Sequence, residues 1–150
     1  MFLIQNIIKE GGNMKKEEIE RFGFGVMADS DEMPEYFMHS DRFLIIDLKN
    51  RKEIIFEEYY VNPHAELVKT KYPDPAGLGD NISDEELQIY MDITEILKGC
   101  KYVLGNSLGY YPKFALEKAN LFFVGLSSRP LPRDHIAHLI EHRALADFHD

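Results

Sequence analysis

The histidines of this chain fall into two groups that could bind a metal. The first group comprises His39, which has Met38 beside it, and His64, all in segments predicted to be loops after strands. Imidazole nitrogen and thioether sulfur are both ligands for soft or borderline transition metals. The same side chains could have structural roles instead, with Met38 packed, His39 capping its loop and His64 solvated. Without three converging donors, the sequence names no particular metal.

The second group lies near the C-terminus and repeats with helical spacing. It contains four residues: His135, His138, His142 and His149. At about 100° per residue they share a sector of roughly 60° on a helix. His138 and His142, at positions i and i+4, could chelate Zn²⁺, Ni²⁺ or iron. The competing interpretation is a solvated polar face opposite the apolar side of the helix.

A glycine-containing turn, Gly105-Asn106-Ser107, comes directly before a predicted helix. Free backbone N–H groups at such a place can hold an anion or the sulfides of a cluster. The spacing matches neither a dinucleotide-binding fingerprint nor a P-loop, so it gives nucleotide binding little support. A tight structural turn explains the same residues equally well.

Cys100 is the only cysteine of the chain. An intramolecular disulfide is therefore impossible, and the chain alone cannot supply a multi-cysteine cluster site. Because Cys100 lies between a predicted helix stop at Gly99 and a buried strand, we expect it to behave as a small hydrophobic residue.

Apolar periodicity and turn residues predict the elements that must position these side chains. Strands are expected at 22–28, 42–48, 53–61, 102–105 and 121–126. Strands 42–48 and 53–61 should form an antiparallel hairpin, since their connection is short and polar. The uninterrupted apolar run of strand 121–126 suggests that both of its faces are covered.

The predicted helices follow the third, fourth and fifth strands. They are expected at 84–98, with a capping box at Ser83 and Glu86, from near Pro112 to about 119, and at 133–148. Residues 62–81, rich in proline and glycine, should form a long exposed loop. The order β-β-β-α-β-α-β-α indicates an α/β fold with helices packed on a mixed sheet, an order that also occurs in ribonuclease H-like folds.

Length and charge narrow the classes of function. A chain of 150 residues with 45% hydrophobic residues fits one domain with one core. The formal net charge of -9 disfavours nucleic acid and anionic membranes as partners. No apolar run reaches the roughly 18 residues of a spanning helix, and a secretion signal is not apparent, so we expect a cytoplasmic protein. Residues 1–20 are interpreted as an extension, within which translation could start at Met14.

Three motifs connect the chain to a known family. They are Glu35-Tyr-Phe-Met-His-Ser-Asp-Arg-Phe-Leu-Ile-Ile-Asp47, Val61-Asn-Pro-His64 and Leu97-Lys-Gly-Cys-Lys-Tyr-Val-Leu-Gly-Asn106. Through these motifs, the chain resembles the NifX-like dinitrogenase iron–molybdenum cofactor biosynthesis family. The resemblance extends from about Phe22 to about Ser128. It departs from the family pattern at four places: Tyr36 replaces a histidine, Met38 a glycine, residues 67–75 a His-Gly-rich loop, and Gly105-Asn106-Ser107 a Gly-Gly turn.

The resemblance implies a ribonuclease H-like fold and a non-enzymatic carrier. Such a protein would bind, store or deliver an iron–sulfur-type cluster or an iron–molybdenum cofactor precursor, in exchange with a donor or acceptor protein. The expected ligand site lies at Met38, His39, His64 and the turn Gly105-Asn106-Ser107, separate from a metal site at His138 and His142.

Two other functions stay open. A regulatory or protein-interaction domain without a cofactor would use the loop at 62–81 to dock a partner. A metal-dependent ribonuclease H-like nuclease would need several carboxylates at strand ends to hold Mg²⁺. Asp29 or Asp31 could supply one of them, but strand 102–105 is followed by Asn106 and not by a carboxylate.

Overall fold

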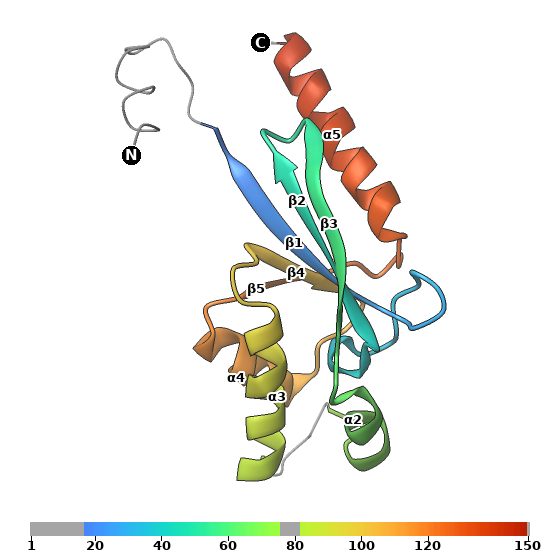
Figure 1. Ribbon diagram of the computed structural model, residues 1–150, viewed down its shortest axis with the longest axis vertical. Helices are drawn as coiled ribbons and strands as arrows, with labels where there is room; N and C mark the ends of the chain where they lie inside the picture. Colours follow the sequence, from blue (N-terminus) through green and yellow to red (C-terminus); the bar gives the residue numbers. More distant parts are fainter. Residues whose placement is uncertain (1–16, 76–81, 150) are drawn as a thin grey trace.

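The computed structural model describes residues 17–75 and 82–149, which form one mixed sheet with helices on both faces (Figure 1). The strands are β1 (Ile19–Val26), β2 (Arg42–Lys49), β3 (Glu53–Val61), β4 (Tyr102–Gly105) and β5 (Phe122–Gly125). Their order across the sheet is β3-β2-β1-β4-β5. β1, β2 and β3 pair antiparallel, whereas β1, β4 and β5 pair parallel. The α/β class and the β2–β3 hairpin are confirmed.

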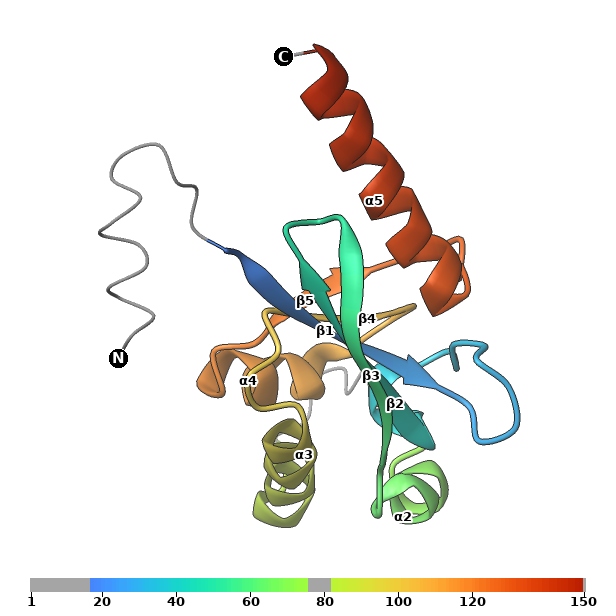
Figure 2. The ribbon, with the colours of Figure 1, turned by 45° about the horizontal axis from the view of Figure 1, so that its top comes forward.

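Helices lie on opposite sides of this sheet. The described residues contain a 3-10 turn, η2 (Phe37–His39), and the α-helices α2 (Ala65–Lys71), α3 (Asp84–Ile96), α4 (Tyr110–Lys118) and α5 (Pro132–His149). Figure 2 shows α3 and α4 on one side of the sheet and α5 on the other. Three of these, α3, α4 and α5, confirm the predicted helices. No helix among the described residues is long and apolar enough to cross a membrane.

β1 alternates phenylalanine and glycine, and its two faces receive different neighbours. Phe22 and Phe24 are fully buried in the core that α5 covers. Gly23 and Gly25 face the opposite side, where helices approach the strand closely. A Cβ at Gly25 would lie 3.0 Å from the Phe37 ring, so only glycine lets η2 sit against the sheet.

Two hydrophobic cores occupy the two faces. The core on the side of α3 and α4 contains among others Phe37, Phe43, Ile45, Tyr90, Ile93, Leu97 and Val103. The core under α5 contains among others Phe22, Phe24, Leu44, Ile46, Leu48, Leu104 and Ile136. Successive side chains of β2 therefore pack in alternate cores, because neighbouring residues of a strand point to opposite faces of the sheet.

The start of α3 follows the predicted cap only in part. Ser83 Oγ accepts a hydrogen bond from Glu86 N at 3.1 Å. The Glu86 carboxylate accepts from the Tyr90 hydroxyl at 2.6 Å instead of closing the capping box. The helix ends at Ile96, two residues before the predicted end, and Gly99 follows with a φ of +94°.

The expectation of a loop throughout residues 62–81 is wrong, because α2 occupies part of it. Ala65 and Val68, three residues apart, fall on one helical face and are buried, which packs α2 beside η2. The neighbouring prolines and glycines favour a loop in the sequence pattern, so this short amphipathic segment was not predicted as a helix. Residues 76–81 lie outside the described residues.

The expectation that β5 is covered on both faces is confirmed only in part. β5 is an edge strand, and Phe122 is 64% exposed. An apolar run does not distinguish a central strand from an edge strand that contributes only part of its residues to each core. Phe123 packs against the core of α3 and α4, and Val124 against the core of α5.

At its N-terminal end, β1 begins inside the segment interpreted as an extension. Ile19 opens the strand, and Glu20 is 2% exposed. The Glu20 carboxylate accepts hydrogen bonds from Arg51 and Lys101, which joins β1 to the hairpin turn and to the start of β4. Residues 1–16, including Met14, lie outside the described residues.

Candidate functional site

The loop after β1 and the turn after β4 lie side by side. Tyr36 and Ser107 form an isolated parallel bridge. Phe37 N donates to Ser107 O at 2.8 Å, and Ser107 N donates to Glu35 O at 3.1 Å. The Asn106 side chain also donates to Glu35 O, at 3.3 Å. The two segments that carry part of the expected ligand site are therefore joined through their backbones.

One of the backbone N–H groups expected to form a cradle at the turn is not free. Ser107 N is already bonded to Glu35 O. The space above Gly105 is occupied by the Phe37 ring, since a Cβ at Gly105 would lie 2.8 Å from it. In this geometry the turn serves packing and attachment of the neighbouring loop, through Gly105, Asn106 and Ser107. This agrees with the interpretation of these residues as a tight structural turn.

Met38 does not reach a ligand site. Its side chain is fully buried in the core on the side of α3 and α4, so its thioether packs among hydrophobic residues. The position follows from η2, which turns Phe37 and Met38 inward together.

Asn62 organises this region, although its residue type did not mark it as a candidate ligand in the sequence. It is 3% exposed. Its amide donates to Ser40 O at 2.9 Å, and its Oδ1 accepts from His64 N at 3.1 Å. The Asn-Pro motif after β3 was the signal that could have identified it, because an asparagine side chain can bond the backbone two residues on.

His39 is partly buried and is held by one ring nitrogen. Its Nε2 lies 3.0 Å from Tyr72 O, the C-cap of α2, and its ring packs edge-on against Tyr36 at a centroid separation of 5.4 Å. A carbonyl only accepts hydrogen bonds, so Nε2 carries a proton, and in the neutral form of the ring the lone pair is on Nδ1. A metal-binding histidine commonly donates its other N–H to a backbone carbonyl in this way.

His64 lies at the opposite end of α2. It is the N-cap residue of the helix, eight residues before Tyr72, a separation of about 12 Å at 1.5 Å per residue. Its Nε2 is 3.9 Å from Asp92 Oδ2. His39 and His64 are therefore not brought together as ligands of one metal ion.

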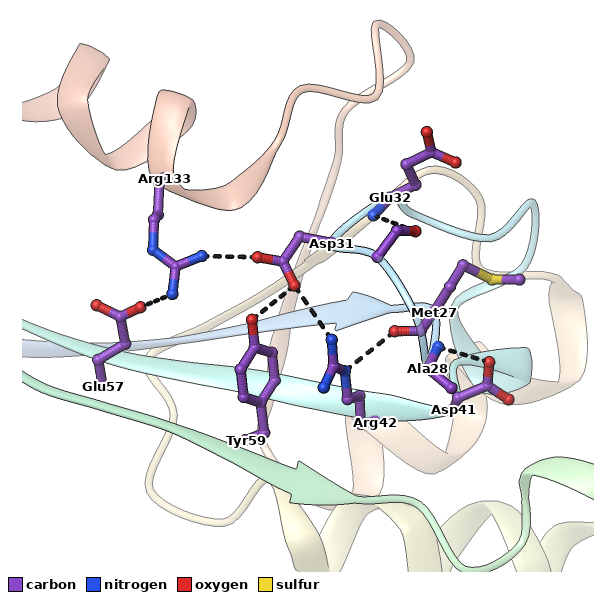
Figure 3. Close-up of polar contacts among 10 residues, drawn as sticks. Met27, Ala28, Asp31, Glu32, Asp41, Arg42, Glu57, Tyr59 and Arg133 are labelled. Carbon is purple, nitrogen blue, oxygen red and sulfur yellow. Dashed lines mark hydrogen bonds and ion pairs between the residues drawn. The ribbon is translucent and has the colours of Figure 1, made fainter.

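The acidic loop after β1 is tied to its surroundings by ion pairs (Figure 3). Asp31 accepts from the Tyr59 hydroxyl at 2.7 Å and from Arg133 at 2.6 Å, and Arg42 lies 3.5 Å away. Arg133 also binds Glu57 on β3. Asp31 consequently connects the loop to the start of α5.

Asp41, at the end of the same loop, has two partners. It accepts from Ala28 N at 2.9 Å and pairs with Lys69 of α2. Asp31 and Asp41 are both bonded to protein groups and hold the loop, whereas Asp29 is exposed. A two-Mg²⁺ nuclease would need several carboxylates that converge on the metal ions.

The histidine stripe on α5 divides into different environments. His138 and His142 are exposed, and their ring centroids are 4.1 Å apart. His135 instead turns toward the sheet, 6.0 Å from the Phe24 ring. Burial, followed by the charges of His138 and Arg51, lowers the pKa of His135. The side chain of His149 lies outside those described.

No group of three or more His, Cys, Asp or Glu residues that could hold a metal occurs within 17–75 and 82–149, as far as their side chains are described. Cys100 is buried, and desolvation raises its pKa to about 12. A thiol in that state is a poor nucleophile and a poor ligand. Cys100 therefore packs as the sequence suggested.

Comparison with known proteins adds no family assignment. No protein-family model matches the chain, and no curated protein matches it. The resemblance to the NifX-like family accordingly rests on the three motifs alone.

Proposed function

We propose that this chain is a non-enzymatic carrier that holds an iron–sulfur-type cluster or precursor through His39. The observation that carries the proposal is the hydrogen bond between His39 Nε2 and Tyr72 O. In the neutral imidazole this bond keeps the proton on Nε2 and orients the ring, and the lone pair of Nδ1 could then bind a metal.

The fold supports the same proposal. Three antiparallel strands followed by two strands parallel to β1 are compatible with the ribonuclease H-like fold that the family resemblance implies. In this arrangement the loop after β1 and the turn after β4 meet at one end of the sheet, and His39 belongs to that loop.

A single imidazole suits a carried cluster better than a resident one. Met38, His64 and the turn Gly105-Asn106-Ser107 do not fit as further ligands, because they are buried, distant or already bonded. A cluster with few protein ligands keeps positions open for the groups of a donor or acceptor protein. We therefore propose weak, exchangeable cargo in the cytoplasm.

Anaerobic incubation with ferrous iron and sulfide tests the proposal. The wild-type chain should bind iron and acquire visible absorption. His39→Gln should bind at least about five-fold less iron than the wild type. Glutamine can still donate an amide N–H to Tyr72 O but lacks the imidazole lone pair. His64→Gln is the matched control and should bind as the wild type does.

Retention of wild-type iron by His39→Gln would refute the role of His39. A urea unfolding curve of each variant separates loss of the ligand from loss of the fold, because a correctly folded His39→Gln should keep the wild-type midpoint.

A protein-interaction domain is the second candidate, favoured by a groove between α4 and β5. The groove has a volume of about 390 Å³ and is lined by Leu108, Lys113, Leu116, Phe122 and Phe123, among others. Three aromatic residues of these two elements are exposed: Tyr110, Phe114 and Phe122. Absence of bound iron from the wild type as well as from both histidine variants would favour this candidate.

A further inference from the structure

The α5 helix presents a second feature that the carrier function does not use. His138 and His142 lie one helical turn apart with their rings in edge-to-face contact, at an interplanar angle of 75°. Both side chains are exposed, so each ring can rotate without disturbing the core. Their i, i+4 spacing allows two imidazole nitrogens to reach one metal ion.

Two histidines leave a zinc site half complete. Zn²⁺ in closed protein sites is tetrahedral and takes four ligands, with imidazole nitrogens at about 2.0–2.1 Å. No described His, Cys, Asp or Glu joins the pair to make a group of three. The described side chains therefore leave the remaining ligand positions to water or to another molecule.

We propose that one Zn²⁺ ion joins two copies of this chain through His138 and His142 of each. A two-fold axis through the ion would supply four imidazoles from two identical helix faces, which closes the coordination without any further residue. Neutral imidazole binds through its lone pair, so no covalent chemistry is involved. The proposal is independent of His39 and of any carried cluster.

The exposed histidine pair on α5 supports a second copy as the partner, because an identical face supplies the two imidazoles that the pair lacks. α5 packs on the sheet through Ile136, whereas Asp134 and Glu141, which lie within about 80° of the histidine pair around the helix axis, are exposed. Asp134 precedes His138 by one turn and is spaced to accept its second N–H.

The net charge of -9 on each chain makes the association depend on the metal. Two copies repel each other, and a divalent cation at the contact offsets part of that repulsion locally. We therefore expect monomers without zinc and dimers with it.

The test combines calorimetric titration with zinc chloride and sedimentation velocity of the full chain. We expect half a zinc ion per chain, a doubling of the sedimenting mass on addition of zinc, and reversal by EDTA. His138→Ala and His142→Ala should each weaken zinc binding at least ten-fold and abolish the dimer. His64→Ala, a histidine on another element, should retain both properties.

Substitution of Co²⁺ for Zn²⁺ reports the coordination directly, because four-coordinate Co²⁺ absorbs much more strongly in the visible than hydrated Co²⁺. One zinc ion per monomer without dimerisation would overturn the proposal, as would a zinc-dependent dimer that survives both substitutions.

Discussion

One hydrogen bond gives His39 a different chemistry from the other described histidines. Tyr72 O holds its Nε2, whereas His64 lies near Asp92 and His138 lies against another imidazole. Residue type and loop position identified His39 as a candidate from the sequence. They could not separate it from Met38, because the inward turn of η2 depends on Gly25 and Gly105 admitting Phe37.

The glycine at position 25 should be indispensable for this arrangement. In Gly25→Ala the new methyl group would overlap Ser40 Oγ and lie 3.0 Å from the Phe37 ring, which would displace η2 and His39. We expect a loss of about 1–3 kcal/mol in the free energy of unfolding, measured with urea.

Gly125→Ala is the control for that substitution. The nearest atom to its added Cβ is 3.5 Å away, which is ordinary contact. Its unfolding free energy should stay within about 0.5 kcal/mol of wild type. An equal loss in both variants would mean that strand propensity, and not the space for Phe37, explains the effect at Gly25.

The elements differ in how far local pattern determines them. Ser83 and a long apolar periodicity predict α3. Two segments rich in β-forming residues, joined by a polar connection, predict the β2–β3 hairpin. α2 is short, and Ala65 and Val68 become informative only once η2 is in place to receive them. The exposure of Phe122 could not be predicted either, because edge position is a property of the whole sheet.

Burial of one side chain should hold α5 more firmly than its ion pairs do. Ile136 is 1% exposed, whereas half of the Arg133 side chain is exposed despite its bonds to Asp31 and Glu57. Ile136→Ala should cost about 2–4 kcal/mol. Arg133→Ala should cost less than about 1 kcal/mol, since exposed ion pairs are screened. Urea unfolding compares the two, and a larger loss in Arg133→Ala would contradict this ranking.

The Glu20 network should make the protein sensitive to acid. The Arg51 hydrogen bond, supported by Lys101 and opposed by burial, lowers the pKa of Glu20 below 4.5. The unfolded state then binds a proton at higher pH than the folded state does. The stabilisation is present above about pH 4.5 and is lost as pH falls through the folded pKa.

Glu20→Gln tests this linkage. We expect it to cost about 1–3 kcal/mol at pH 7, because Arg51 and Lys101 lose a charged acceptor. The decline of the unfolding free energy below about pH 4.5 should be shallower in Glu20→Gln than in wild type. Glu58→Gln, at an exposed position of β3, should leave the pH profile unchanged. A profile of Glu20→Gln parallel to wild type would contradict the role of Glu20.

At the scale of the molecule, the sheet order brings together segments that are distant in sequence. Pairing of β4 beside β1 sets the turn at Ser107 against the loop at Tyr36, 71 positions earlier in the chain. The order of strands and helices could be inferred from periodicity, but which strands become neighbours depends on how both cores close at once. For the same reason, the separation of His39 from His64 could not be derived from their motifs.

The most direct test of the carrier proposal is the nitrogen hyperfine coupling of a loaded cluster, measured by pulsed electron paramagnetic resonance on chain labelled with ¹⁵N-histidine. The cluster is assembled from ferrous iron and sulfide and reduced to a paramagnetic state. We predict a coupling from one imidazole nitrogen in wild type and in His64→Gln, and its absence in His39→Gln. A coupling that persists in His39→Gln would contradict the assignment of His39 as the ligand.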